Sequence, residues 1–136
     1  MCLRGGQYFR SEKTKNIIDY SYAQKYLNVC VNHNMRDAKN CSCCEKCMRT
    51  LIAIDSVGAL DKFSTVFDLD KWKKNKFTYL CRLRYLEGKE PFATDNAKFV
   101  RFNGKKVPCY LVAVIVYNYV RARRKLARIL RKIFKR

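Results

Sequence analysis

A set of closely spaced cysteines is the feature of this sequence best suited to chemistry. They follow the spacing Cys-x10-Cys-x2-Cys-x2-Cys, and we call them the cysteine cluster: Cys30, Cys41, Cys44 and Cys47. Four thiolates can surround a Zn²⁺ ion tetrahedrally, and two-residue spacings allow successive sulfurs to turn toward one ion. The spacing therefore predicts a closed zinc site with four cysteine ligands. It indicates metal binding strongly and a reaction only weakly.

Two neighbouring residues offer alternative ligands. Cys43 adjoins Cys44, and either one could supply the third sulfur, although only Cys44 keeps two-residue spacing on both sides. We therefore favour Cys44. His33 follows Cys30 by three residues, which is a permissible ligand spacing, and it is the spare ligand of an alternative site with three cysteines and one histidine. The simpler hypothesis is a group of buried reduced thiols, but so many thiols in 18 residues argue against it.

Length and cysteine content restrict the class of protein. A chain of 136 residues has room for one domain with a core and an appendage. Eight cysteines in a secreted protein would indicate a disulfide framework. However, residues 1–10 contain no apolar signal segment, and the cysteines cluster instead of spreading along the chain. We therefore expect a cytoplasmic protein with reduced cysteines.

The strongly positive charge implies an anionic partner. The formal net charge is +19, far more than solubility requires. Residues 121–136 contain nine Lys or Arg residues and no acid. We expect this segment to contact an anionic membrane surface or nucleic acid, which would place the protein peripherally at the membrane in the first case.

The apolar spacing predicts a mainly α fold. We expect one helix from about Ser11, continuing through the apolar positions up to Leu27, and a second from near Cys44 to near Gly58. A third helix begins after the capping residue Asp68 and ends before Glu87-Gly88. Residues 92–107 are ambiguous, because Asn103-Gly104 resembles a hairpin turn but no convincing second strand follows.

The C-terminal region divides the chain into two predicted parts. Residues 1–108 form the small helical domain around the zinc site, and residues 109–136 form an apolar and then basic helix. The apolar part is only about 18 Å long as a helix, which is too short to span a bilayer. The basic part has an amphipathic pattern that fits an interfacial helix or a helix resting on a missing domain. Its apolar positions are Leu126, Ile129, Leu130, Ile133 and Phe134.

Two basic residues of the second expected helix lie close to Cys47, the last cysteine of the cluster. A zinc ion with four thiolates carries about two negative charges, which Lys46 and Arg49 could stabilise together with the helix N-terminal amides. They could equally bind an anionic substrate. The sequence leaves both roles open.

Residues 40–50 resemble a known family motif. They read Asn-Cys-Ser-Cys-Cys-Glu-Lys-Cys-Met-Arg-Thr. This is similar to the Asn-Cys-Gly-x-Cys-x-Lys-Cys-x-Arg-Thr motif of proteins related to 7-cyano-7-deazaguanine synthase, in the PP-loop (adenine nucleotide alpha-hydrolase) superfamily. The resemblance extends over about residues 8 to 70, and it includes residues 9–13, 27–30 and 58–63. Ser42 in place of glycine and the additional Cys43 are departures from the motif.

The resemblance implies an ATP-dependent enzyme with a Rossmann-like domain before this region. That domain would bind the ATP pyrophosphate with a Ser-Gly-Gly-x-Asp-Ser loop, and Gly5-Gly6 lacks both serines and the aspartate. We therefore expect a zinc-binding C-terminal fragment, inactive alone, whose ATP-binding domain is separate or missing. The alternatives are a stand-alone basic zinc module that binds nucleic acid, or a peripheral membrane or partner-docking protein.

Overall fold

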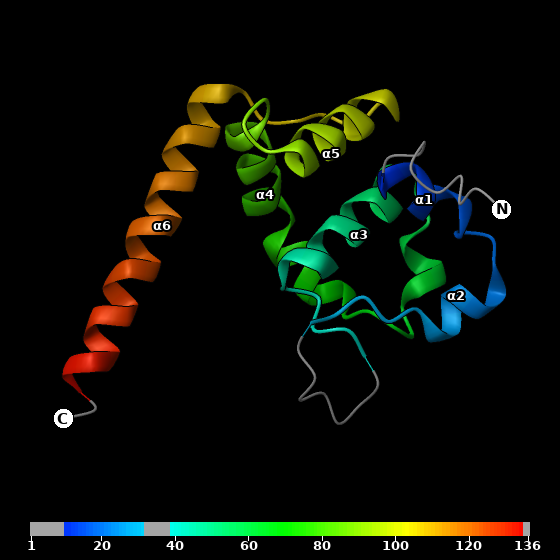
Figure 1. Cartoon of the computed structure of the whole chain (residues 1–136), viewed down its shortest axis with the longest axis horizontal. Coiled ribbons are helices and arrows are strands. Elements are labelled where there is room, and N and C mark those ends of the chain that lie inside the picture. Colours follow the sequence, from blue (N-terminus) through cyan, green and yellow to red (C-terminus); the bar gives the residue numbers. More distant parts are fainter. Residues whose placement is uncertain (1–9, 32–38, 135–136) are drawn as a thin grey trace, which may run out of the picture.

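The computed structural model describes residues 10–31 and 39–134, and the described chain is mainly α-helical (Figure 1). Its elements are α1 (Arg10–Asn16), α2 (Ser21–Tyr26), α3 (Glu45–Ser56), the 3-10 helix η2 (Leu60–Phe63), α4 (Leu69–Leu86), α5 (Pro91–Phe102) and α6 (Tyr110–Ile133). In this part of the chain, extended backbone pairs only at the isolated bridge between Asn40 and Phe67. The predicted fold class is confirmed. Gly5-Gly6 and His33 lie outside the described residues.

Helix α3 lies at the centre of the core. From Cys47 to Ser56 all of its residues except Arg49 are buried. It packs against α1, α4, α5 and η2. A helix that is apolar around most of its circumference must be covered on every side, and Leu51, Ile52 and Ile54 supply that apolar surface.

The structure confirms the predicted ends of α3 and α4. Gly58 has a φ of +75°, and the N–H groups of Gly58 and Ala59 donate to the carbonyls of Asp55 and Ile54. This pattern satisfies the last carbonyls of a helix with a left-handed residue after it. At the start of α4, the Asp68 carboxylate accepts a bond of 2.9 Å from the Lys71 N–H.

The single helix expected from Ser11 to Leu27 is wrong, because the chain folds back between α1 and α2. Ile18 is buried in the intervening turn, and the Gln24 side chain donates to its carbonyl at 2.8 Å. Ser11 does not cap α1, since its hydroxyl donates to Asp95 of α5 at 2.7 Å. Tertiary contacts therefore override a continuous helical spacing.

Residues 92–107 do not form a hairpin. Most of them belong to α5, in which Ala93, Ala97 and Val100 face the core at helical spacing. Asn103-Gly104 ends this helix, with Gly104 at a φ of +71° and the Lys105 N–H donating to the Val100 carbonyl. The Asn-Gly pair misleads because a left-handed residue serves both a hairpin turn and a helix end.

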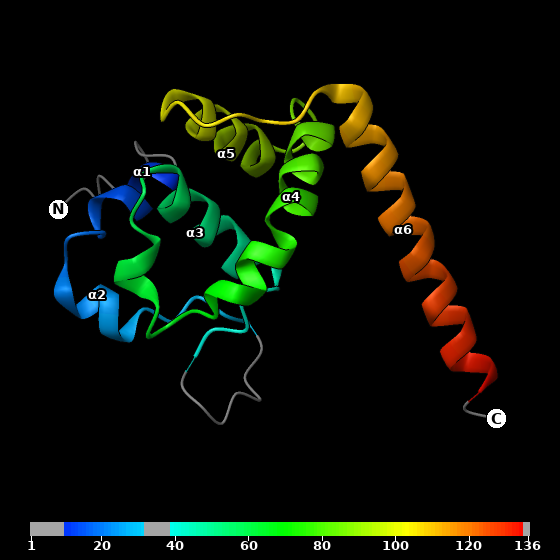
Figure 2. The same cartoon turned by 180° about the vertical axis from the view of Figure 1, so that it is seen from behind.

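Helix α6 joins the apolar and basic segments into one helix of 24 residues. It lies at the outer edge of the molecule and packs on α4, where Ala113 is fully buried and Tyr117 stacks on Tyr85 with 4.1 Å between ring centroids (Figure 2). None of the described helices is both long enough and apolar enough to cross a bilayer. The division of the chain at residue 108 stays a prediction.

Glu87 links the end of α4 to α5. Its carboxylate accepts from Arg101 of α5 at 2.8 Å and from Arg84 at 2.6 Å. The hydrogen bond from Arg101 contributes most to lowering the pKa of Glu87 to about 2, and burial of the carboxylate opposes this shift. The ionised carboxylate therefore stabilises the packing of α5 on α4.

We predict that Glu87→Gln lowers the free energy of unfolding by about 1 kcal/mol at neutral pH, allowing for solvent around Arg101. The Glu87 pKa falls on folding from an ordinary value of 4.5, so its contribution is present above that pH and is lost as the pH falls toward 2. The difference between variant and wild type should therefore shrink in urea titrations below pH 4.5. Asp70→Asn, which removes an exposed ion pair with Lys73, is the control and should change little. A difference that stays constant down to acid pH would contradict the prediction.

Candidate metal centre

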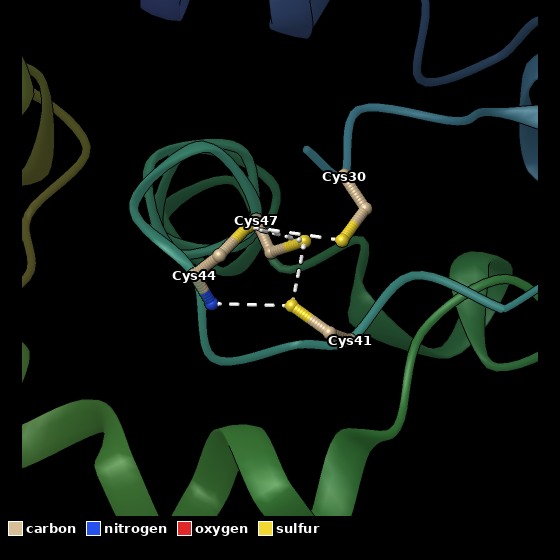
Figure 3. Close-up of side chains that lie close together, drawn as sticks. All are labelled: Cys30, Cys41, Cys44 and Cys47. Carbon is tan, nitrogen blue, oxygen red and sulfur yellow. Dashed lines mark hydrogen bonds between the residues drawn. The ribbon is translucent and has the colours of Figure 1, made fainter. Parts of the chain in front are cut away.

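The structure brings the four thiols of the cysteine cluster together in one place (Figure 3). All four sulfurs lie within 4.8 Å of one another. The distance is 3.9 Å between the Cys30 and Cys44 sulfurs, 3.8 Å between those of Cys41 and Cys47, and 3.3 Å between those of Cys44 and Cys47. Sulfurs 2.3 Å from a tetrahedral ion are about 3.8 Å apart, so the cluster has the dimensions of a metal site.

Three separate stretches of chain supply these thiols. Cys30 lies in the non-helical segment after α2, and Cys41 follows the bridge at Asn40. Cys44 is the N-cap residue of α3, and Cys47 lies in its first turn. The turn from Cys41 to Cys44 is tight, because the Cys44 N–H donates to the Cys41 sulfur at 3.3 Å. The two-residue spacings thus place three thiols around the start of one helix.

Asn40 holds the segment that carries Cys30 against the rest of the cluster. It is 3% exposed, and its side-chain oxygen accepts from the N–H groups of Val29 and Cys30 at 2.8 and 3.0 Å. Its amide group donates to the carbonyls of Leu27 and Val66 at 2.7 and 3.0 Å. One buried side chain therefore fixes the backbone from Leu27 to Cys30. Its position directly before Cys41 is the sign of this role in the sequence, because its backbone partners lie 10 to 26 residues away along the chain.

Ser42 occupies a restricted backbone position between Cys41 and Cys43. It is fully buried and has a φ of +53°, in the left-handed region that favours glycine. Its hydroxyl donates to the Asn40 carbonyl at 3.2 Å and accepts from the Asp68 N–H at 2.8 Å. These two hydrogen bonds offset part of the conformational strain and attach the cysteine loop to the start of α4.

Burial and neighbouring groups give the thiols different proton affinities. Burial alone would raise the pKa of Cys44, but N–H donors of Cys47 and Val31 and the nearby thiols lower it to about 6. The pKa of Cys47 is raised by burial and by the adjacent Cys44 sulfur. Several thiolates in this volume would repel one another unless a cation lay between them.

Of the alternative ligands, Cys43 is exposed and lies outside the cluster of converging sulfurs. His33 lies outside the described residues, so its part in the site stays a prediction. Cys81 and Cys109 belong to α4 and to the N-cap of α6. No disulfide joins any of the described cysteines.

The two basic residues close to Cys47 differ in their surroundings. Lys46 is exposed at the start of α3. Arg49 pairs with Glu45 at 3.2 Å, and its guanidinium lies 4.2 Å from the ring centroid of Phe92. Glu45 also pairs with Arg82 of α4. Through its contact with Phe92, Arg49 helps to join α3 to α5 next to the cluster.

Comparisons with protein-family models, curated proteins and solved structures found no match to this chain.

We predict that Asn40→Ala lowers the stability of the metal-loaded protein by about 2–4 kcal/mol, because it removes four hydrogen bonds and takes this partner from the partly buried Val29 N–H and Leu27 carbonyl. Metal affinity should also fall by about tenfold or more, since the segment that carries Cys30 is no longer held in place. Urea unfolding and competition with a chelator measure the two effects. Asn75→Ala is the matched control, because that exposed amide bonds only within its own helix, to the Lys71 carbonyl. Equal behaviour of the two variants would contradict the role given to Asn40.

We predict that Ser42→Ala is less stable than Ser42→Gly by about 1 kcal/mol. Both variants lose the two hydroxyl hydrogen bonds, but only alanine keeps a Cβ atom in the left-handed conformation. Chemical denaturation of both variants under the same metal-loaded conditions measures the difference. Equal stabilities would show that residue 42 is not strained.

Proposed function

We propose that the chain binds one Zn²⁺ ion through the cysteine cluster and that the ion stabilises the helical fold. The observation that carries this proposal is the convergence of four thiols at the separations of a tetrahedral site. Soft thiolates in tetrahedral geometry favour zinc or iron, and zinc is the redox-inert choice for a structural centre. With four protein ligands no position stays open for a substrate, so the metal does not act as a catalyst.

The ion would join two non-helical segments of the chain to the most buried helix. Cys30 lies in a non-helical segment and Cys41 in a tight turn, whereas Cys44 and Cys47 lie at the start of α3. Metal binding supplies folding free energy when the site does not exist in the unfolded chain. The N–H groups at the start of α3 also favour the negative charge of a zinc tetrathiolate.

The first test is a pair of variants at adjacent cysteines. Cys44→Ser should lower zinc content and zinc affinity by at least about tenfold and make the fold unstable. Cys43→Ser should leave both unchanged, because its side chain is exposed and outside the cluster. Metal analysis, with circular dichroism before and after chelation, provides the readout. Zinc loss in Cys43→Ser, or a wild-type fold that chelation does not change, would contradict the proposal.

We further propose that this zinc module is the C-terminal part of a PP-loop ATP-dependent enzyme related to 7-cyano-7-deazaguanine synthase. Two positions of the similar motif support this proposal physically. The motif asparagine corresponds to Asn40, which holds the segment that carries Cys30. The motif glycine corresponds to Ser42, whose positive φ suits glycine. An ATP-binding domain, separate or encoded upstream, would supply the chemistry.

We expect no ATP-dependent pyrophosphate release from this 136-residue chain alone, because it has no phosphate-binding loop in its sequence. Pyrophosphate assays on the zinc-loaded protein measure this directly. Robust release by the chain itself would overturn the assignment of catalysis to another domain. Sequencing the genomic region before Met1 tests the kinship separately, since a Ser-Gly-Gly-x-Asp-Ser coding segment is expected there or in a neighbouring gene.

A further inference from the structure

The outer side of α6 carries a long row of exposed apolar side chains, which we call the apolar stripe: Leu111, Val112, Ile115, Tyr119, Leu126, Ile129, Leu130 and Ile133. Their spacing of three and four residues places them along one side of the helix. Leu111 is 75% exposed and Ile115 is 68% exposed near one end, and Ile133 is 60% exposed near the other. The helix is about 36 Å long, so the stripe exceeds the scattered apolar residues of an ordinary surface.

The opposite side of α6 faces α4. Ala113 and Tyr117 pack there, and further along the helix Arg124 and Arg128 line a cavity of about 440 Å³ together with Thr78 of α4. The apolar stripe therefore points away from the rest of the protein. The position of α6 at the edge of the molecule leaves this outer side uncovered by any other described element (Figures 1 and 2).

The charge of this region selects among possible partners. No Asp or Glu residue follows Asp95 in the sequence. Basic residues occupy both the flanks of the apolar stripe and the side that faces α4. Those within α6 are Arg121, Arg123, Arg124, Lys125, Arg128, Arg131 and Lys132. A partner must therefore combine an apolar interior with a negatively charged surface.

A second copy of the chain fits this requirement poorly. Arg123 and Lys125 flank the apolar stripe on its two sides, so two copies packed stripe to stripe would bring like charges together in either orientation. Nucleic acid would satisfy the guanidinium groups but would leave the apolar stripe in water. An anionic bilayer offers both acyl chains and charged headgroups.

We propose that α6 docks on an anionic lipid surface, with the helix lying in the plane of the interface and the apolar stripe turned into the acyl-chain boundary. Arg123 and Lys125 then reach the headgroups beside the helix. Arg124 and Arg128 lie on the far side, about one helix diameter or 10 Å away, where attraction persists although salt weakens it. The whole of α6 forms the docking surface, including the apolar positions before the basic tail.

The test is sedimentation of the full zinc-loaded chain with vesicles of phosphatidylcholine, with and without phosphatidylserine. The wild type should sediment with the anionic vesicles, less so as salt is raised, and only weakly with neutral ones. The double variant Ile115→Glu, Ile129→Glu should bind anionic vesicles at least about tenfold more weakly, because it places charges in the stripe. Ile115→Ala with Ile129→Ala tests the loss of apolar area without new charge and should weaken binding by about threefold or more.

The matched control is Phe77→Glu with Phe102→Glu. These residues are 55% and 83% exposed on α4 and α5, so the control removes two exposed apolar side chains and adds the same two charges elsewhere. It should bind within about twofold of the wild type. Thermal melts of all variants verify that the fold is retained, as expected for exposed positions.

Three results would overturn the proposal. The first is equal vesicle binding by the wild type and the Ile115→Glu, Ile129→Glu variant. The second is a wild type that binds structured RNA but no vesicles and loses RNA binding in Arg124→Gln with Arg128→Gln, which would assign the basic side to nucleic acid. The third is a wild-type dimer without vesicle binding that the Glu variant converts to a monomer, which would assign the stripe to a second copy.

Discussion

Four thiol groups must share one small volume, and the rest of the fold depends on how the chain meets that constraint. The sulfurs come from three stretches of chain and lie within 4.8 Å of one another. Thiolates this close repel one another in a buried setting, and a divalent cation reverses that repulsion. Because Cys44 and Cys47 lie at the start of the central helix, an ion bound here would fix the segment of Cys30 directly onto the core.

The polypeptide prepares this arrangement with its own hydrogen bonds. Asn40 binds backbone groups from Leu27 to Cys30, and Ser42 connects the cysteine loop to the N–H of Asp68. Asp68 in turn caps α4. A short network thus runs from the segment after α2, through the cysteine cluster, to the start of the next long helix. The cysteine cluster and the helix ends are therefore parts of one folding unit, and damage to either should loosen both.

Local patterns in the sequence were sufficient for features that depend on local physics. Cysteine spacing singled out the four thiols that converge, the Asp68 cap marked α4, and Gly58 marked the end of α3. The break between α1 and α2 and the identity of α5 depend on distant contacts, such as that of Ser11 with Asp95. The anchoring role of Asn40 was also hidden, because its four partners come from segments up to 26 residues away.

Zinc-edge X-ray absorption of the purified chain tests the central claim most directly, because it reports the ligand atoms themselves. A structural zinc held by Cys30, Cys41, Cys44 and Cys47 predicts one shell of four sulfurs at about 2.3 Å. A shell of three sulfurs and one nitrogen at about 2.0 Å would instead place His33 in the site and contradict the four-thiolate centre.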